Sequence, residues 1–90
     1  MNKMPLIPEF SEYKQRNKWI KENADYFTVV RRRNRRYERY TAPSFEEATA
    51  LAQKYLRGDT ENTRWMIYAV AGIHDTLVAT VSAEGIKDHD

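Results

Sequence analysis

Residues 42–58, APSFEEATALAQKYLRG, decide the fold, because they contain the strongest helix signal in the chain. Ser44 and Glu47 have the spacing of a capping box, in which each residue accepts a hydrogen bond from the other's backbone N–H. Gly58 is suited to end a helix. An apolar face recurs every three or four residues between these two signals, through Phe45, Ala48, Leu51, Ala52 and Tyr55. The spacing therefore predicts a helix over about 45–57.

Two β-rich stretches precede this helix. Residues 26–30, YFTVV, are β-branched and aromatic, and residues 37–41, YERYT, alternate, so each predicts a strand. Asn34 lies between them and tolerates left-handed turn geometry. We therefore expect an antiparallel hairpin with its tip at Arg32–Arg36. A helix through the arginines is the alternative, since arginine is a good helix former, but the flanking Thr-Val-Val and Tyr-Thr-Ala-Pro disfavour it.

A second hairpin is expected after the helix, from residues 64–71, RWMIYAVA, and 76–82, TLVATVS, joined by a turn at 72–75. Trp65, a predicted core residue, points with Ile67, Ala69 and Ala71 to one side of the first of these strands. Its other side also carries large side chains, namely Met66, Tyr68 and Val70. We therefore expect a central strand that is covered on both faces, with the second cover provided by the first helix or by a second copy of the chain.

The remaining segments complete the expected domain. Residues 9–22 have a narrow apolar stripe at helical spacing, and Pro8 is well placed to open that helix. Residues 1–8 are expected to form an extended arm, and residues 83–90 an acidic, flexible tail. A single compact domain over 9–82 remains. Its predicted class is α+β with the order αββαββ, a four-stranded, mainly antiparallel sheet and two helices.

Composition excludes several classes of function. The 90 residues contain no cysteine and only two histidines, which excludes disulfides, thiolate metal sites and a three-histidine metal site. Apolar runs are too short to span a membrane, and the N-terminus lacks a secretion signal, so we expect a soluble, cytoplasmic protein. His74 and Asp75 are adjacent, but no serine, cysteine or second histidine is placed to act with them. We predict no catalytic residues, metal or cofactor, and no enzyme activity.

Charge is distributed unevenly along the chain. The first 57 residues contain 13 Lys and Arg against 7 Asp and Glu, whereas the last 33 contain 2 against 6. Six of the arginines lie within residues 31–39, RRRNRRYER. Such a concentration of positive charge indicates an anionic partner.

The arginine run resembles, in composition, the arginine-rich RNA-binding peptides of phage antitermination and retroviral export proteins. Guanidinium groups pair with phosphates through two hydrogen bonds, and aromatic rings offer stacking surfaces to bases. We therefore predict a small, basic module that binds RNA or DNA mainly through its backbone. The hairpin residues predicted to bind are Arg31, Arg32, Arg33, Arg35, Arg36, Arg39, Tyr37 and Tyr40. A solvated, solubilising turn is the alternative interpretation of the same run.

Two further surfaces are candidates. Lys14, Lys18 and Lys21 lie on one face of the first helix and would extend the nucleic-acid surface if that face adjoins the hairpin. Met66, Tyr68, Val70 and Trp19 are candidates for a protein interface or a homodimer contact. The alternative function is a protein-interaction adaptor or inhibitor, of the kind that a phage or mobile element uses as an accessory, whose arginines grip an acidic protein surface.

Overall fold

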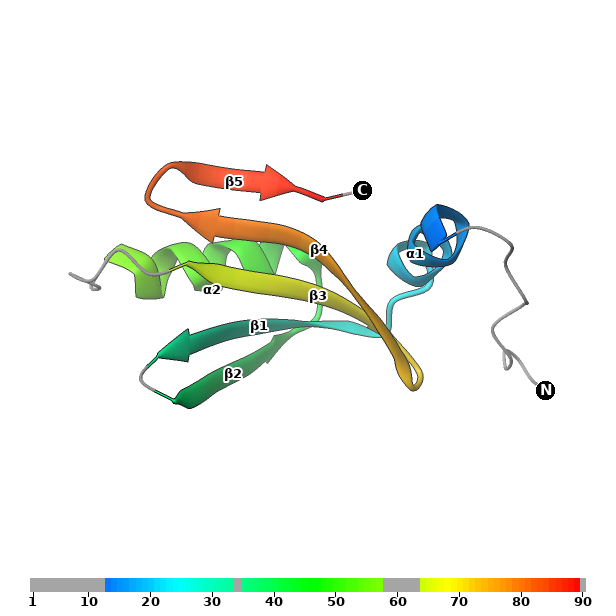
Figure 1. Ribbon diagram of the computed structural model, residues 1–90, viewed down its shortest axis with the longest axis horizontal. Helices are drawn as coiled ribbons and strands as arrows, with labels where there is room; N and C mark the ends of the chain where they lie inside the picture. The colour runs from blue at the N-terminus through cyan, green and yellow to red at the C-terminus, as the bar shows by residue number, and fades with distance from the viewer. Residues whose placement is uncertain (1–12, 34, 58–63, 90) are drawn as a thin grey trace.

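The computed structural model describes residues 13–33, 35–57 and 64–89 (Figure 1). These ranges contain two α-helices and five β-strands, which confirms the α+β class. In chain order the elements are α1 (Tyr13–Glu22), β1 (Tyr26–Arg33), β2 (Arg36–Ala42), α2 (Phe45–Arg57), β3 (Trp65–Ala71), β4 (His74–Ser82) and β5 (Gly85–Asp88). The expected arm at 1–8, the first turn of the first helix at 9–12, Asn34, Gly58 and the loop at 59–63 lie outside the described residues.

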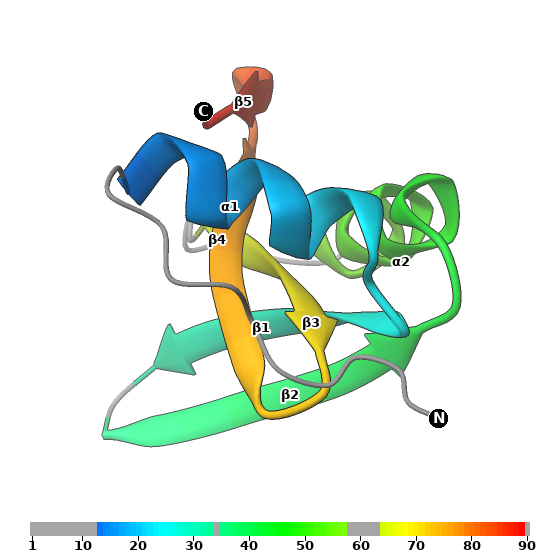
Figure 2. The same cartoon turned by 90° about the vertical axis from the view of Figure 1, so that its right-hand side faces the viewer.

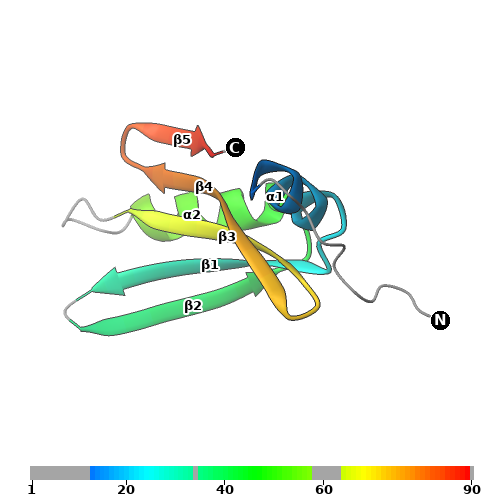
Figure 3. The ribbon, with the colours of Figure 1, turned by 45° about the vertical axis from the view of Figure 1, so that its right-hand side comes forward.

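The strands form one antiparallel sheet in the order β2-β1-β3-β4-β5 (Figures 1 and 3). Both expected hairpins are present, and β1 of the first pairs with β3 of the second. The prediction that β3 is a central strand is confirmed, since it has two strands on either side. β2 therefore forms one edge of the sheet, with the hairpin tip extending from the end opposite α1 (Figure 1).

Helix α2 begins where the sequence predicted. The N–H of Glu47 donates to Ser44 Oγ at 3.1 Å, which is the first of the two hydrogen bonds of a capping box. Ala48 and Ala52 are completely buried on the helix face turned to the sheet. Because these side chains are small, the backbone of α2 can approach the strands closely.

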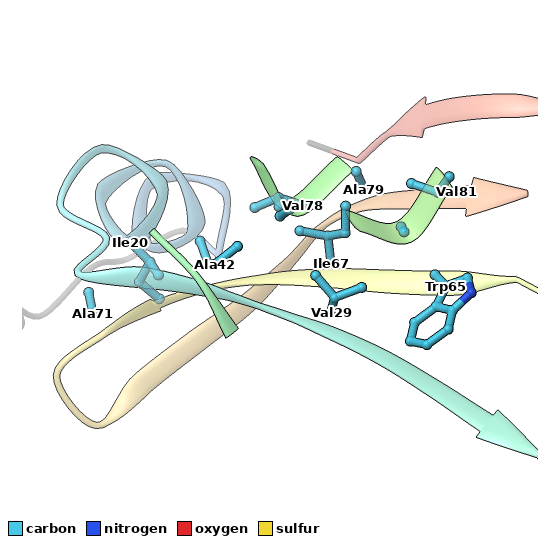
Figure 4. Packing of buried hydrophobic residues seen from close by; sticks show 12 residues of the cluster. Ile20, Val29, Ala42, Trp65, Ile67, Ala71, Val78, Ala79 and Val81 are labelled. Carbon is cyan, nitrogen blue, oxygen red and sulfur yellow. The ribbon is translucent and has the colours of Figure 1, made fainter. Parts of the chain in front are cut away.

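Both helices contribute to one hydrophobic core on a single face of the sheet. Ile20 of α1 and Ala48 of α2 belong to the same buried cluster as Trp65, Ile67 and Val29 (Figure 4). Figure 2 shows α1 and α2 on the same side of β1 and β2. Of the two covers expected for the second face of β3, the first helix is therefore wrong, because its buried residue Ile20 joins the first core instead. The second copy of the chain stays a prediction.

A β-bulge explains the mixed apolar pattern of β4. The register of β3 against β4 shifts between Ile67 and Tyr68, so that Val78 is an extra residue on β4. Val78 and the next residue, Ala79, are both buried, with 2% and 0% of their surface exposed. The bulge allows two consecutive apolar side chains to be buried, which a regular strand does not.

The prediction of a flexible tail over 83–90 is wrong for most of its length. Residues Gly85–Asp88 form β5, which pairs antiparallel with β4, so the sheet has five strands rather than four. All four residues of β5 are exposed, and Gly85 has a positive φ of 118° in the turn that leads into the strand. Backbone pairing to the edge of β4 forms this strand, and the apolar pattern that predicts strands is absent from it.

Candidate nucleic-acid interface

The register of the β1–β2 hairpin divides its arginines between two faces. Residues directly opposite each other in an antiparallel pair place their side chains on the same face. Val29 pairs with Tyr40, and Arg31 pairs with Glu38, which places these four residues on the face that the helices cover. The intervening pairs, Val30 with Arg39 and Arg32 with Tyr37, lie on the opposite face, which the two helices do not cover and which we call the second face of the sheet.

Arg31 is part of the core and is not a surface cation. Only 9% of its side chain is exposed, and its guanidinium Nη2 lies 2.6 Å from Glu38 Oε1. The same guanidinium lies over the ring of Trp65, 4.6 Å from the ring centre. The prediction that Arg31 presents its charge to a nucleic acid is therefore wrong, because burial and a carboxylate of the same chain already satisfy that charge.

Tyr40 is also assigned to the helix-covered face. Its ring stacks on Tyr55 of α2 with 4.9 Å between ring centres, and Tyr55 stacks in turn on Trp65 at 5.6 Å. Together with Arg31 and Glu38, these three rings form a cluster that fixes the hairpin to α2 and β3. The expected stacking of a base on Tyr40 therefore has to compete with a stack within the protein, and we remove Tyr40 from the candidate site.

Among the hairpin arginines whose side chains the structure describes, four are exposed, namely Arg32, Arg35, Arg36 and Arg39. Arg35 lies in the turn and has a positive φ of 69°. The left-handed geometry that the sequence associates with Asn34 is thus found at Arg35, and Asn34 itself lies outside the described residues. Arg33 pairs with Arg36 through its backbone, while its side chain is not among those described.

Tyr37 is the most exposed aromatic residue of the hairpin, with 69% of its surface accessible. The guanidinium carbon of Arg32, its cross-strand partner, lies 6.0 Å from the ring centre. Arg39 is on the same face, two residues further along β2. The structure thus brings together an exposed aromatic ring and two cations on the second face of the sheet. The sequence named these three residues as candidates without assigning them to one face.

A shallow depression runs across the second face from β2 to β4. Its lining residues are Thr28, Val30, Tyr37, Arg39, Tyr68 and Asp75. Val30 and Thr28 form a buried floor, with 7% and 8% of their surfaces exposed. The residues predicted from the sequence did not include this floor or Asp75. The alternation of side chains along residues 26–30, YFTVV, could have identified the floor, because it places Thr28 and Val30 on the same face as Arg32.

The lysines of α1 do not join the hairpin surface. Lys14, Lys18 and Lys21 are exposed and line a separate hollow with Leu77 and His89. Helix α1 lies at the opposite end of the molecule from the hairpin tip (Figures 1 and 3). The condition for one continuous basic surface, that this helix face adjoins the hairpin, is therefore not met.

The predicted interface residues separate in the same way. Met66, Tyr68 and Val70 lie on the second face of β3, opposite the helix-covered core. Trp19 packs against that core and is partly buried. Val70 is buried, with 8% of its surface exposed. We therefore keep only Met66 and Tyr68 as candidates for an external contact, and a homodimer through them stays a prediction.

The chain was compared with protein-family models, curated proteins and solved structures, and none of them matches it. Within residues 13–33, 35–57 and 64–89, no group of three or more metal-ligating side chains is arranged to hold an ion. In the same part of the chain, no helix is long and apolar enough to cross a membrane.

Proposed function

We propose that this protein is a small, non-enzymatic nucleic-acid-binding module whose exposed hairpin arginines contact phosphates. The observation that carries the proposal is the pairing of Arg31 with Glu38. Glu38 is the only acidic residue within the hairpin sequence, 26–42. Because this carboxylate is committed to the buried Arg31, the hairpin has no acid left to neutralise Arg32, Arg35, Arg36 and Arg39.

The geometry supports contacts with a nucleic-acid backbone. Arg32 and Arg39 lie on the second face of the hairpin, whereas Arg35 lies in the turn and Arg36 begins β2 on the other face. A polymer that passes around the tip can therefore contact several of them at once. Guanidinium groups remain charged at any physiological pH and bind phosphate through paired hydrogen bonds. Phosphates carry no base identity, so we expect binding that depends weakly on sequence.

Binding across a salt series tests this proposal. Four phosphate contacts give a slope of log Kobs against log salt of about −2.8 on single strands and about −3.6 on duplexes. The triple variant Arg32→Gln, Arg36→Gln, Arg39→Gln retains one of the four arginines, so its slope falls to about −0.7 to −0.9. Fluorescence anisotropy of labelled oligonucleotides with mixed sequence measures both quantities.

The lysines of α1 provide the matched control. The variant Lys14→Gln, Lys18→Gln, Lys21→Gln removes the same charge at the other end of the molecule, and we expect its salt slope to stay near that of the wild type. Equal weakening by both triple variants contradicts the proposal, because it shows that net charge alone attracts the nucleic acid. Absence of binding to the oligonucleotides at low salt also contradicts the proposal. The alternative function, a protein-interaction adaptor whose arginines bind an acidic protein surface, is then favoured.

A further inference from the structure

The second face of the sheet combines features that phosphate binding alone does not need. A depression with a buried floor, Thr28 and Val30, lies between two tyrosines, Tyr37 on β2 and Tyr68 on β3. Figure 1 shows this sheet with α2 behind it, on the opposite face. Contact with the phosphates on the outside of a duplex requires only cations that reach them. Tyrosines around a buried floor of threonine and valine are instead suited to the flat faces of nucleobases.

We infer that this depression binds single-stranded nucleic acid, with unpaired bases stacked on Tyr37 and Tyr68 and the backbone on Arg32 and Arg39. The inference rests on the proposed function and names its ligand class. A base within a duplex is stacked between its neighbours and cannot reach an aromatic side chain unless it is unpaired. The ring of Tyr37 is accessible, and the guanidinium of Arg32 lies over it, 6.0 Å from the ring centre, so the phosphate of a stacked nucleotide would lie close to a cation.

The charged residues of the depression determine the orientation in which a nucleotide binds. Arg39 lines its β2 side, whereas Asp75 lines its β4 side. Asp75 lies diagonally from Tyr68, because Tyr68 pairs with Leu77 and Asp75 is two residues away on the same strand. Such diagonal neighbours lie about 7–8 Å apart. The carboxylate repels phosphate and accepts hydrogen bonds from base amino groups, so the base faces Asp75 and the backbone faces the arginines.

The double variant Tyr37→Leu, Tyr68→Leu tests the stacking. Leucine retains apolar contact with the floor but removes both rings. We expect affinity for a labelled single-stranded oligonucleotide to fall about tenfold or more, while affinity for the duplex of the same sequence and the salt slope stay unchanged. Tyr26→Leu is the control, because Tyr26 is an exposed tyrosine of β1 that does not line the depression. DNA and RNA versions of the strand show which sugar is preferred.

Each outcome separates this inference from the proposed function. If the arginine variant loses binding while the tyrosine variant binds single strands as the wild type does, stacking is overturned and phosphate contact stands. A wild type that binds duplex more tightly than single strand also overturns the inference. Circular dichroism and urea unfolding verify that the double variant folds. Tyr37→Leu alone provides a second test, since 69% of that residue is exposed and we expect its removal to leave the fold intact.

Discussion

Arg31 and Glu38 lie directly opposite each other on β1 and β2, and their side chains form an ion pair of 2.6 Å on the helix-covered face of the sheet. The pair contacts the aromatic cluster because the guanidinium of Arg31 lies over Trp65. One arginine of the basic run therefore has a structural role, and its neighbour Arg32 faces the other way. The two roles can be separated experimentally.

We expect Glu38→Gln to destabilise the fold. The substitution leaves the buried Arg31 charge without its carboxylate, and breaking a fully buried pair costs about 3–5 kcal/mol. Because 35% of the Glu38 side chain is exposed, water partly compensates, and we expect a loss of about 1–3 kcal/mol. Urea unfolding followed by tryptophan fluorescence measures the change in the free energy of unfolding.

An Arg31→Met background provides the control for this effect. There the glutamate has no buried cation to neutralise, so adding Glu38→Gln changes the free energy of unfolding by less than about 0.5 kcal/mol, as at an ordinary surface position. Equal losses in both backgrounds would show that Glu38 stabilises the hairpin by some means other than its pairing with Arg31.

The contrast between Arg31 and Arg32 shows how far sequence predicts the site. The two strands and the basic tip were predicted correctly, since β-branched residues and charge are properties of the local sequence. Which arginines reach solvent depends on the register of β1 against β2 and β3, and a shift of one residue exchanges the two faces. Nothing in a run of identical side chains fixes that register. It is set by Val29, which packs into the core, and by Trp65 beneath Arg31.

We expect Arg35→Gly to stabilise the protein. Arg35 has a φ of 69°, so its backbone is in the left-handed conformation. In that conformation Cβ crowds the backbone, which costs about 1–2 kcal/mol for an L-residue other than glycine, Asn or Asp. Glycine removes this cost but has more conformational entropy in the unfolded chain, so the net gain is about 0.5–1 kcal/mol. Thermal or urea unfolding measures the change.

Arg36→Gly is the matched control, because it removes the same charge from the neighbouring position in strand β2. Glycine in a regular strand is expected to destabilise by about 0.5–1 kcal/mol. If both glycine variants shift the unfolding transition in the same direction, relief of backbone strain at Arg35 is not the cause.

We expect Asp25→Ala to weaken the junction between α1 and the sheet. The carboxylate Oδ2 of Asp25 accepts a hydrogen bond of 2.9 Å from the N–H of Gly72, in the turn between β3 and β4. The backbone N–H of Asp25 donates to the carbonyl oxygen of Val70 at 2.7 Å. Losing the side-chain bond is expected to lower the free energy of unfolding by about 1 kcal/mol.

Asp25→Asn separates the hydrogen bond from general charge effects. Asparagine retains an oxygen acceptor for the Gly72 N–H, so we expect it to lose less than half as much stability as alanine in the same urea unfolding experiment. Hydrogen exchange at Gly72 provides a local measurement, with faster exchange in the alanine variant. Unchanged exchange at that amide would contradict the assigned bond.

The C-terminal strand shows why part of the fold escaped prediction. Helix α2 was predicted with its observed bounds, because its cap and its apolar face are both local. Strand β5 has four exposed residues and no apolar alternation, so its formation depends on the backbone partners that β4 provides in the folded protein. A side-chain contact adds to this pairing, since Thr80 Oγ1 lies 2.7 Å from His89 Nε2.

Truncation after Ala83 tests whether β5 stabilises the sheet. The shortened chain loses the pairing of four residues of β4 with β5, and each backbone hydrogen bond contributes about 0.5–1.5 kcal/mol. We expect a total loss of about 1–3 kcal/mol in urea unfolding, and self-association at high concentration, because the edge of β4 is then unpaired. Size-exclusion chromatography at several concentrations detects that association.

Ile86→Ser in the full chain is the control, because it changes the one large apolar side chain of β5 and retains the backbone pairing. Its stability should stay within about 0.5 kcal/mol of the wild type, and a loss equal to that of the truncation would assign the stabilisation to the side chain instead.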